Sequence, residues 1–172
     1  MSSRVEAEKA ANELLKAIWA KEGLVDCPRP VDPFHIASQL GLSVERRLLD
    51  PDVSGMLAKR PGRDPEVYIN AMDSENRQRF SCAHEIGHYV KRAGSSGGDD
   101  DSWGYIDRRG PSASRGIDPE EIYANQFAAA LLMPEEAVRH LRDSIGPAAM
   151  AVEFGVSLDS MRYRLDNLGL RG

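Results

Sequence analysis

The run His84-Glu85-Ile86-Gly87-His88 carries the strongest chemical signal in the chain. Residues four apart on a helix lie on one face, so both imidazoles can bind the same metal ion. Glu85 lies beside them, where it can take a proton from a water molecule at that metal. Zinc accepts nitrogen ligands and keeps a coordination position open, so we expect one Zn²⁺ per chain. Manganese and iron suit the same ligand types.

The alternative is a histidine pair with a purely structural role. The motif is flanked by Phe80-Ser81-Cys82-Ala83 and by Tyr89-Val90. These residues predict an amphipathic helix with one buried side, whereas a chance occurrence would often be exposed and broken by turns. The context therefore favours the metal site.

A catalytic zinc ion usually has three protein ligands. The longer motif with a third histidine does not continue here, because Lys91 and Gly94 occupy its glycine and last histidine positions. His35 and His140 are isolated in the sequence. Glu121 is the better candidate, because it starts a helical pattern with small residues on the same face, suited to close packing against the first metal helix.

Asn125 follows Glu121 by one helical turn and can hydrogen-bond a ligand imidazole. Two alternatives stay open at this point. Glu120 is a neighbouring candidate ligand, and the sequence Asp118-Pro119-Glu120-Glu121 also resembles a capping box, which would explain Glu121 by the start of a helix alone.

The elements that must position these residues follow from hydrophobic spacing and from capping signals. Alternating residues predict short strands at 42–46, 55–58 and 67–70, and hence a small antiparallel sheet in an α+β domain. Residues 93–117 are too long and too polar for an ordinary connection, so we expect a functional lid or mobile loop there. Helices are predicted at residues 5–22, 34–40, 74–92, 119–133, 134–144, 147–154 and 158–167.

Composition excludes several classes of protein. The 172 residues suit one domain, or one domain with a small appendage, and 41% hydrophobic residues can form a core. The net charge of −5 argues against a broad nucleic-acid surface or an anionic-membrane binder. No apolar run is long enough to span a membrane, and the N-terminus does not read as a secretory signal. Two cysteines predict a reduced, cytoplasmic protein.

Several of these segments together resemble the ImmA/IrrE family of zinc metallo-endopeptidases. The resemblance rests on Phe80 to His88 and on the run from Glu121 to Met133-Pro134. It extends upstream to Tyr68-Ile69-Asn70 and downstream to residues 154–170, and so covers about residues 30–170. Two long motifs in the right order make the resemblance specific.

The resemblance implies a minimal zincin-like fold with a small antiparallel sheet, a metal-binding helix pair and a C-terminal, helix-turn-helix-like segment. The expected division is an N-terminal helix and turn (1–29), a catalytic core (30–134) and a C-terminal helical subdomain packed on that core (135–172). His84, His88 and Glu121 would hold the metal, and Glu85 would be the catalytic acid and base.

Members of this family are cytosolic proteases of bacteria and their mobile elements, and they cleave helix-turn-helix repressors. The resemblance therefore implies a repressor as substrate, in a stress-response, mobile-element or toxin–antitoxin-like system. Peptide hydrolysis also needs a donor to the oxyanion. Tyr105, Arg108, Arg109 and Tyr68 are candidates, and the sequence does not choose between them or distinguish them from solvated residues.

Two rival functions remain. The pattern of residues 148–168 resembles a DNA-binding helix-turn-helix. However, residues 139–172 hold five arginines and four acids, and this nearly neutral charge binds phosphate weakly. Direct DNA binding is therefore not expected. The chain could instead bind a repressor without cutting it, as an antirepressor or toxin component, although such a role has no need of Glu85. Substrate, scissile bond, activating signal and oligomeric state are not encoded in any pattern that we recognise.

Overall fold

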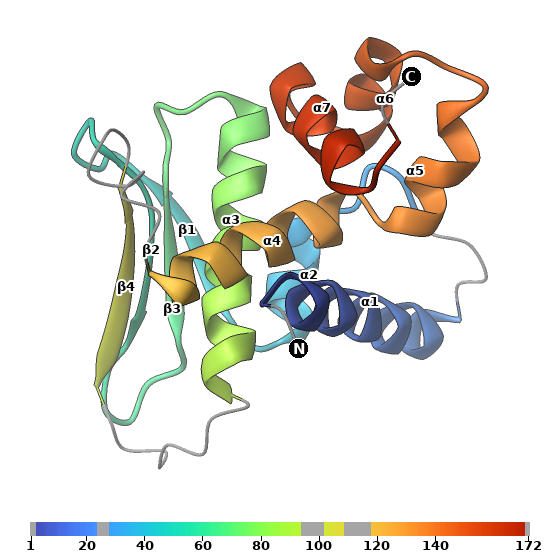
Figure 1. Ribbon diagram of the computed structural model, residues 1–172. Coiled ribbons are helices and arrows are strands. Elements are labelled where there is room, and N and C mark those ends of the chain that lie inside the picture. Colours follow the sequence, from blue (N-terminus) through green and yellow to red (C-terminus); the bar gives the residue numbers. More distant parts are fainter. Residues whose placement is uncertain (1–2, 24–27, 94–101, 109–117, 171–172) are drawn as a thin grey trace.

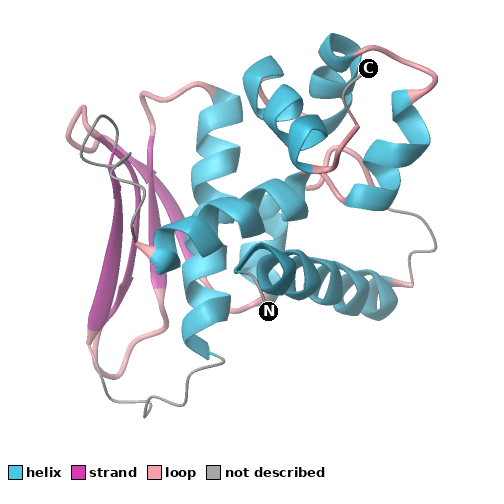
Figure 2. Cartoon of the chain, viewed as in Figure 1, coloured by secondary structure: helices cyan, strands magenta, loops and turns pink. Residues whose placement is uncertain are grey.

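The computed structural model describes residues 3–23, 28–93, 102–108 and 118–170. Within these ranges the α+β class is confirmed, with helices and a single sheet (Figures 1 and 2). Each predicted helix is present, with its ends shifted by at most two residues. The elements are α1 (Ser3–Glu22), α2 (Pro33–Gln39), β1 (Ser43–Arg47), β2 (Val53–Lys59), β3 (Glu66–Asn70), α3 (Glu75–Ala93), β4 (Trp103–Arg108), α4 (Pro119–Leu132), α5 (Glu135–Arg142), α6 (Pro147–Phe154) and α7 (Leu158–Asn167).

The sheet has four strands in the order β1-β3-β2-β4. Strand β2 is antiparallel to both of its neighbours, as expected, but β1 and β3 are parallel. The chain reverses after β1 and again after β2, so β3 runs in the same direction as β1 and pairs with it. The order in which strands become neighbours depends on contacts between distant residues, which strand-by-strand patterns do not report.

The segment 93–117 is not the continuous loop that the sequence predicts. Its middle part forms β4, an edge strand whose aromatic and β-branched residues favour extended structure. Side chains alternate along it: Trp103, Tyr105 and Asp107 are half-buried, and the residues between them are exposed. Residues 94–101 and 109–117 lie outside the described residues, so the prediction of a lid stays untested.

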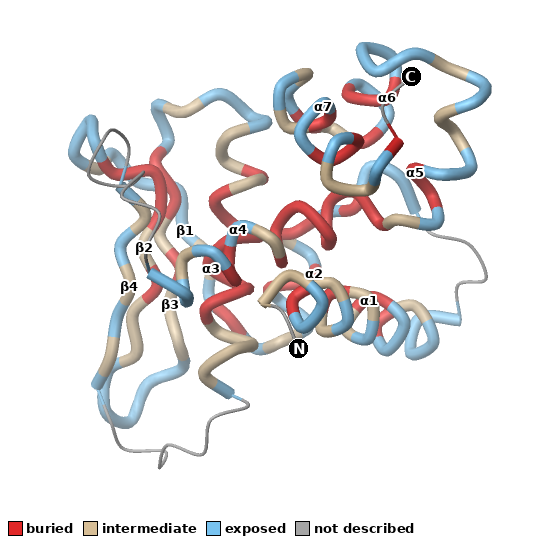
Figure 3. Tube along the Cα trace, in the orientation of Figure 1, coloured by how far each residue is buried: buried red, intermediate tan, exposed pale blue. Residues whose placement is uncertain are grey.

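The helices lie on one face of the sheet, and α3 runs along that face (Figure 1). Helix α4 crosses α3, and α1 packs against α4 on the side away from the strands. Burial follows this arrangement, since buried residues gather along α3 and α4 and in strands β2 and β3 (Figure 3). Leu57, Val67 and Ile69 supply the sheet's share of this core, each fully buried.

Two buried arginines hold the C-terminal helices against the rest of the chain. Arg164 of α7 is 1% exposed and donates to the carboxylate of Glu8 at 2.6 and 2.7 Å and to the Met133 carbonyl at 3.0 Å. Arg79 of α3 donates to the Gly155 carbonyl at 3.0 Å, in the turn between α6 and α7. Among the described helices, none is long and apolar enough to cross a membrane.

Candidate metal centre

Helix α3 carries the motif His84 to His88 where the helix is covered on two sides. All residues from Ser81 to His88 are buried, because the sheet packs on one side of α3 and α4 on another. The backbones of α3 and α4 approach closely at Gly87, where an added Cβ would lie 3.0 Å from Cα of Ala124 and 3.2 Å from Cβ of Phe127. This close approach, which the small residues of α4 favour, brings Glu121 to the two imidazoles.

Three ligand atoms converge between the two helices. His84 Nε2 lies 3.1 Å from His88 Nε2, and the Glu121 carboxylate lies 3.3 Å from the first nitrogen and 3.1 Å from the second. All three candidate ligand atoms lie within 4.8 Å of one another. Two imidazoles and one carboxylate match the donor set of a catalytic zinc site, so the residues present fit a divalent metal ion.

The start of α4 is arranged so that Glu121 is not needed as a cap. Asp118 accepts a hydrogen bond from the Glu120 amide at 2.9 Å, and Pro119 occupies the first helical turn. Among the described residues, Glu120 is not part of the converging cluster. The alternative ligand considered from the sequence therefore has no geometric support.

The charges at this centre depend on one another. Hydrogen bonds from His84 and His88 hold the pKa of the Glu121 carboxyl well below its usual range. Burial lowers the pKa of His84, but the hydrogen bond to Glu121 and the nearby carboxylates outweigh it, so that this pKa is raised. The Glu121 carboxylate is therefore ionised, and its negative charge favours a cation between the two imidazoles.

Asn125 lies beside His84 as its spacing predicts. Its Oδ1 is 3.1 Å from Nδ1 of His84. An amide oxygen only accepts, so Nδ1–H donates to it; in the neutral imidazole that binds a metal, the lone pair of Nε2 is then left facing His88 and Glu121. The contact fixes both the tautomer and the orientation of the ring.

Glu85 is the residue of the centre whose carboxylate lacks hydrogen-bond partners. The side chain is fully buried, and neither carboxylate oxygen has a hydrogen-bond partner. Burial raises its pKa to about 8. Strand β2 covers it with Gly55, where an added Cβ would lie 2.9 Å from Oε1 of Glu85. A buried carboxyl without a partner costs stability, and such groups are concentrated at functional sites.

Tyr105 is the one described oxyanion candidate that lies at the centre. Its ring stacks on His88, with centroids 4.3 Å apart and planes 13° apart. In the sheet it pairs with the buried Leu57, so it points from β4 towards α3. Burial raises the pKa of its hydroxyl, which keeps the group protonated as a donor near neutral pH.

The structure does not bring the other oxyanion candidates to the centre. Tyr68 lies between the buried Val67 and Ile69 on β3 and therefore faces the opposite side of the sheet. Arg108 also points to that side and pairs with Asp52 at 2.6 Å. Arg109 lies outside the described residues.

Sequence reasoning missed a polar cluster next to Glu85. Asp107 of β4 accepts hydrogen bonds from Arg77 at 3.1 Å and from Ser81 at 3.2 Å, both on α3. The spacing of Arg77, Ser81 and Glu85, four residues apart on one helix face, is visible in the sequence. Asp107 gave no such signal, because only strand pairing brings it to α3.

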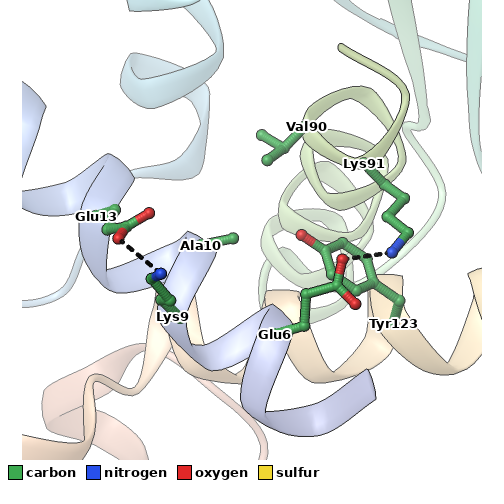
Figure 4. Close-up of a pocket in the computed structure, with 7 residues that line it drawn as sticks. All are labelled: Glu6, Lys9, Ala10, Glu13, Val90, Lys91 and Tyr123. Carbon is green, nitrogen blue, oxygen red and sulfur yellow. Dashed lines mark hydrogen bonds and ion pairs between the residues drawn. The ribbon is translucent and has the colours of Figure 1, made fainter. Parts of the chain in front are cut away.

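Two hollows among the described residues lie away from the metal centre. One, of about 310 Å³, is bordered by α1, α3 and α4, and an ion pair between Lys91 and Glu6 at 2.6 Å crosses it (Figure 4). Burial raises the pKa of Tyr123 in its wall to about 12. The other, of about 970 Å³, lies between α1 and α5. Neither hollow is lined by His84, Glu85, His88 or Glu121.

Comparison with known proteins gives three findings. The family described as "IrrE N-terminal-like domain" matches residues 37–166. The radiation response metalloprotease IrrE of Deinococcus radiodurans is 35% identical over 113 residues, which cover 59% of this chain and 32% of that protein. The solved structure of a Mycobacterium tuberculosis transcriptional regulator superposes with a TM-score of 0.52 at 17% identity, covering 96% of this chain and 52% of that one. At this identity the structural likeness shows the fold alone. The chain spans about a third and about half of the lengths of these two proteins.

Proposed function

The chain belongs to the family of the IrrE N-terminal-like domain, and from this premise we propose that it is a zinc-dependent endopeptidase that cleaves a helix-turn-helix repressor in a stress response. The observation that carries the proposal is Glu85, a fully buried carboxyl without a hydrogen-bond partner, directly beside the converging His84, His88 and Glu121. A metal site with a purely structural role has no use for such a group.

The residues of the centre divide into metal ligands, a proton carrier and a residue that orients a ligand. His84, His88 and Glu121 would hold the metal. When bound, a zinc ion polarises the scissile carbonyl and lowers the pKa of water. Glu85, ionised beside the bound cation, would accept a proton from the attacking water and deliver it to the leaving amine. Asn125 keeps His84 in the required tautomer.

Tyr105 is the proposed oxyanion donor. Its position on His88 places the ring next to the ligand cluster, and its hydroxyl stays protonated near neutral pH. A hydroxyl preorganised in this way stabilises the charge that develops on the carbonyl oxygen in the transition state. We expect Tyr105→Phe to lower kcat more than it raises KM, because the hydrogen bond strengthens as that charge develops.

Strand β4 offers a way to bind an extended peptide. Within the described residues it pairs only with β2, so its other edge carries unpaired backbone groups. A substrate segment added along this edge would receive backbone hydrogen bonds irrespective of its sequence, next to Tyr105. The specificity for one repressor would then come from contacts elsewhere on that protein.

The choice of substrate rests on the family resemblance of the sequence, and the names of two similar proteins support the choice of pathway. IrrE of Deinococcus radiodurans is named for a radiation response, and the superposed structure is a transcriptional regulator. A repressor as substrate requires a cytoplasmic protein. The proposed division into an N-terminal part (1–29), a catalytic core (30–134) and a C-terminal subdomain (135–172) leaves that subdomain available to bind the repressor.

DNA binding through the C-terminal helices is not proposed. A DNA-binding surface needs arginines that are free to reach phosphates. In the described part of this segment each arginine pairs with an acid: Arg139 with Glu135, Arg142 with Asp143, Arg162 with Asp159 and the buried Arg164 with Glu8.

The test pairs the purified chain with the helix-turn-helix protein encoded nearest to it, with and without added Zn²⁺. Cleavage is followed on a gel, and metal content is measured by mass spectrometry. We expect a defined fragment from the wild type with metal, and no fragment from Glu85→Gln at unchanged metal content. Glu121→Gln should lose metal, whereas the matched control Glu120→Gln should keep it.

The rival proposal is a partner that binds a repressor without cutting it. Stable binding by the wild type, with metal present and no fragment formed, would favour that role. Cleavage by Glu85→Gln at the wild-type rate would contradict the mechanism, and equal metal loss from Glu120→Gln and Glu121→Gln would contradict the ligand set.

A further inference from the structure

One carboxylate of strand β4 is hydrogen-bonded to two side chains of α3. Asp107 Oδ2 accepts from Nη2 of Arg77 at 3.1 Å and from Oγ of Ser81 at 3.2 Å. The Asp107 side chain is 11% exposed, and Ser81 is fully buried. The carboxylate therefore crosses from the edge of the sheet to the helix that carries the metal-binding histidines.

A β-bulge in β2 completes this attachment. The register between β2 and β4 shifts between Val53 and Gly55, so Ser54 is the extra residue. The Ser54 hydroxyl is buried and accepts from Nε of Arg77 at 3.1 Å. One guanidinium thus bonds to β2 through Ser54 and to β4 through Asp107.

Two side chains of β4 contact two successive parts of α3. Asp107 and Tyr105 are two residues apart and point to the same side of the sheet. Asp107 meets Arg77 and Ser81, and Tyr105 stacks on His88. A slip of β4 by one residue would turn both side chains to the solvent face.

Backbone pairing with β2 holds strand β4 on one edge, and Asp107 adds directed hydrogen bonds between its side chain and α3. Within the described residues it pairs on one edge only, and an edge strand opens more readily than a central one. At its other end, Trp103 lies under the guanidinium of Arg92 at 4.9 Å, a contact that tolerates sliding more than a directed hydrogen bond does.

We propose that Asp107 is a positioning residue that fixes the register of β4 and so holds Tyr105 over His88. This role rests on the proposed peptidase function only in so far as Tyr105 acts on a substrate. The placement of the strand is a property of the folded chain, and it can be measured without any substrate.

The first experiment uses the full chain in a Trp19→Phe background. The sequence has two tryptophans, so Trp103 on β4 becomes the only one and reports on the strand. In Asp107→Asn, we expect Trp103 to emit at longer wavelength and to be quenched more by acrylamide. The β4 amides should exchange hydrogen about tenfold faster, which is the effect expected from the loss of one charge-assisted hydrogen bond. Ser81→Ala should shift both signals in the same direction by less.

The matched control is Asp52→Asn. Asp52 also pairs with an arginine of β4, Arg108, but on the exposed face of the sheet. It loses the same charge, and we expect no change in Trp103 emission or in β4 exchange. Equal signals in Asp107→Asn and Asp52→Asn, or wild-type signals in Asp107→Asn, would overturn the proposal.

The second experiment measures cleavage. Asp107→Asn should lower kcat on the order of tenfold or more, since small displacements of a catalytic group cost about that much. If Asp107 acts through Tyr105, adding Asp107→Asn to Tyr105→Phe lowers kcat little further. Full additivity of the two effects would contradict this route. An inactive wild type would contradict the proposed function, while the fluorescence and exchange results would still decide the positioning role.

Discussion

Replacing Gly87 by alanine tests whether the contact between α3 and α4 builds the metal centre. At an open helical position this substitution stabilises a protein by about 1 kcal/mol, because alanine is the better helix former. Gly87 is not an open position. Its added Cβ would lie 3.0 Å from Cα of Ala124 and 3.2 Å from Cβ and Cδ1 of Phe127.

The magnitude follows from the atoms that must move. One of the three contacts is with backbone, so the methyl group is accommodated only if α4 shifts by a few tenths of an ångström. Overpacking of this kind costs about 1–3 kcal/mol, and the middle of that range exceeds the gain in helix propensity by about 1 kcal/mol. We therefore expect Gly87→Ala to lower the free energy of unfolding by about 1 kcal/mol. The same shift moves Glu121 away from the two histidines, so metal affinity falls as well.

The assay is urea denaturation of the metal-free protein together with a competition titration against a zinc chelator. Gly146→Ala is the matched control, because an added Cβ there meets no atom within 4 Å and φ is −74°. The control should keep wild-type metal affinity. A Gly87→Ala protein that is more stable than the wild type and binds metal equally well would refute the reasoning.

Three further predictions concern pH, burial and ligand orientation. In the metal-free protein, the pKa of Glu85 is raised from 4.5 to about 8, so the folded state keeps a proton that the unfolded chain loses. The free energy of unfolding should therefore fall by up to about 5 kcal/mol as the pH rises from about 5 to about 8. In urea denaturation, Glu85→Gln should reduce this dependence of stability on pH. An unchanged pH dependence in that variant would contradict the effect of burial on Glu85. Arg164→Met should lower the free energy of unfolding by about 3 kcal/mol, because it leaves Glu8 and the Met133 carbonyl without their partner; an unchanged urea midpoint would count against this. Asn125→Ala should weaken zinc binding about 10- to 100-fold in a competition titration, and wild-type affinity would show that the contact with His84 is dispensable.

Local patterns predicted most of the helical structure. Asp118-Pro119 indicates a helix start in the sequence, and in the structure the aspartate side chain accepts a backbone N–H. Such a signal works because a helix is built from contacts between residues at most four apart. The spacing of His84 and His88 is of the same kind, so their common face follows from the sequence.

The sheet was predicted less completely. The sequence predicts three of its strands, but it places β4 in a loop and does not indicate the parallel pairing of β1 with β3. Strand pairing joins residues far apart in the chain. The alternation of buried and exposed residues that marks a strand does not indicate which strand it pairs with, or whether the pairing is parallel or antiparallel. Strand β4 has only six residues and lies in a glycine-rich segment, so its alternation of half-buried and exposed side chains gives a weak signal in the sequence.

The sequence by itself determined which chemistry this chain can carry: two histidines and a glutamate in one helical turn, and a glutamate at the start of a second helix. Only the tertiary structure decided how these groups combine. It placed Glu121 against both imidazoles through the contact at Gly87, and it buried Glu85 under Gly55 without a partner. It also placed Tyr105, and neither Tyr68 nor Arg108, beside the ligand cluster. A side chain on a strand faces one side of the sheet or the other, and the packing of the whole core decides which side faces α3.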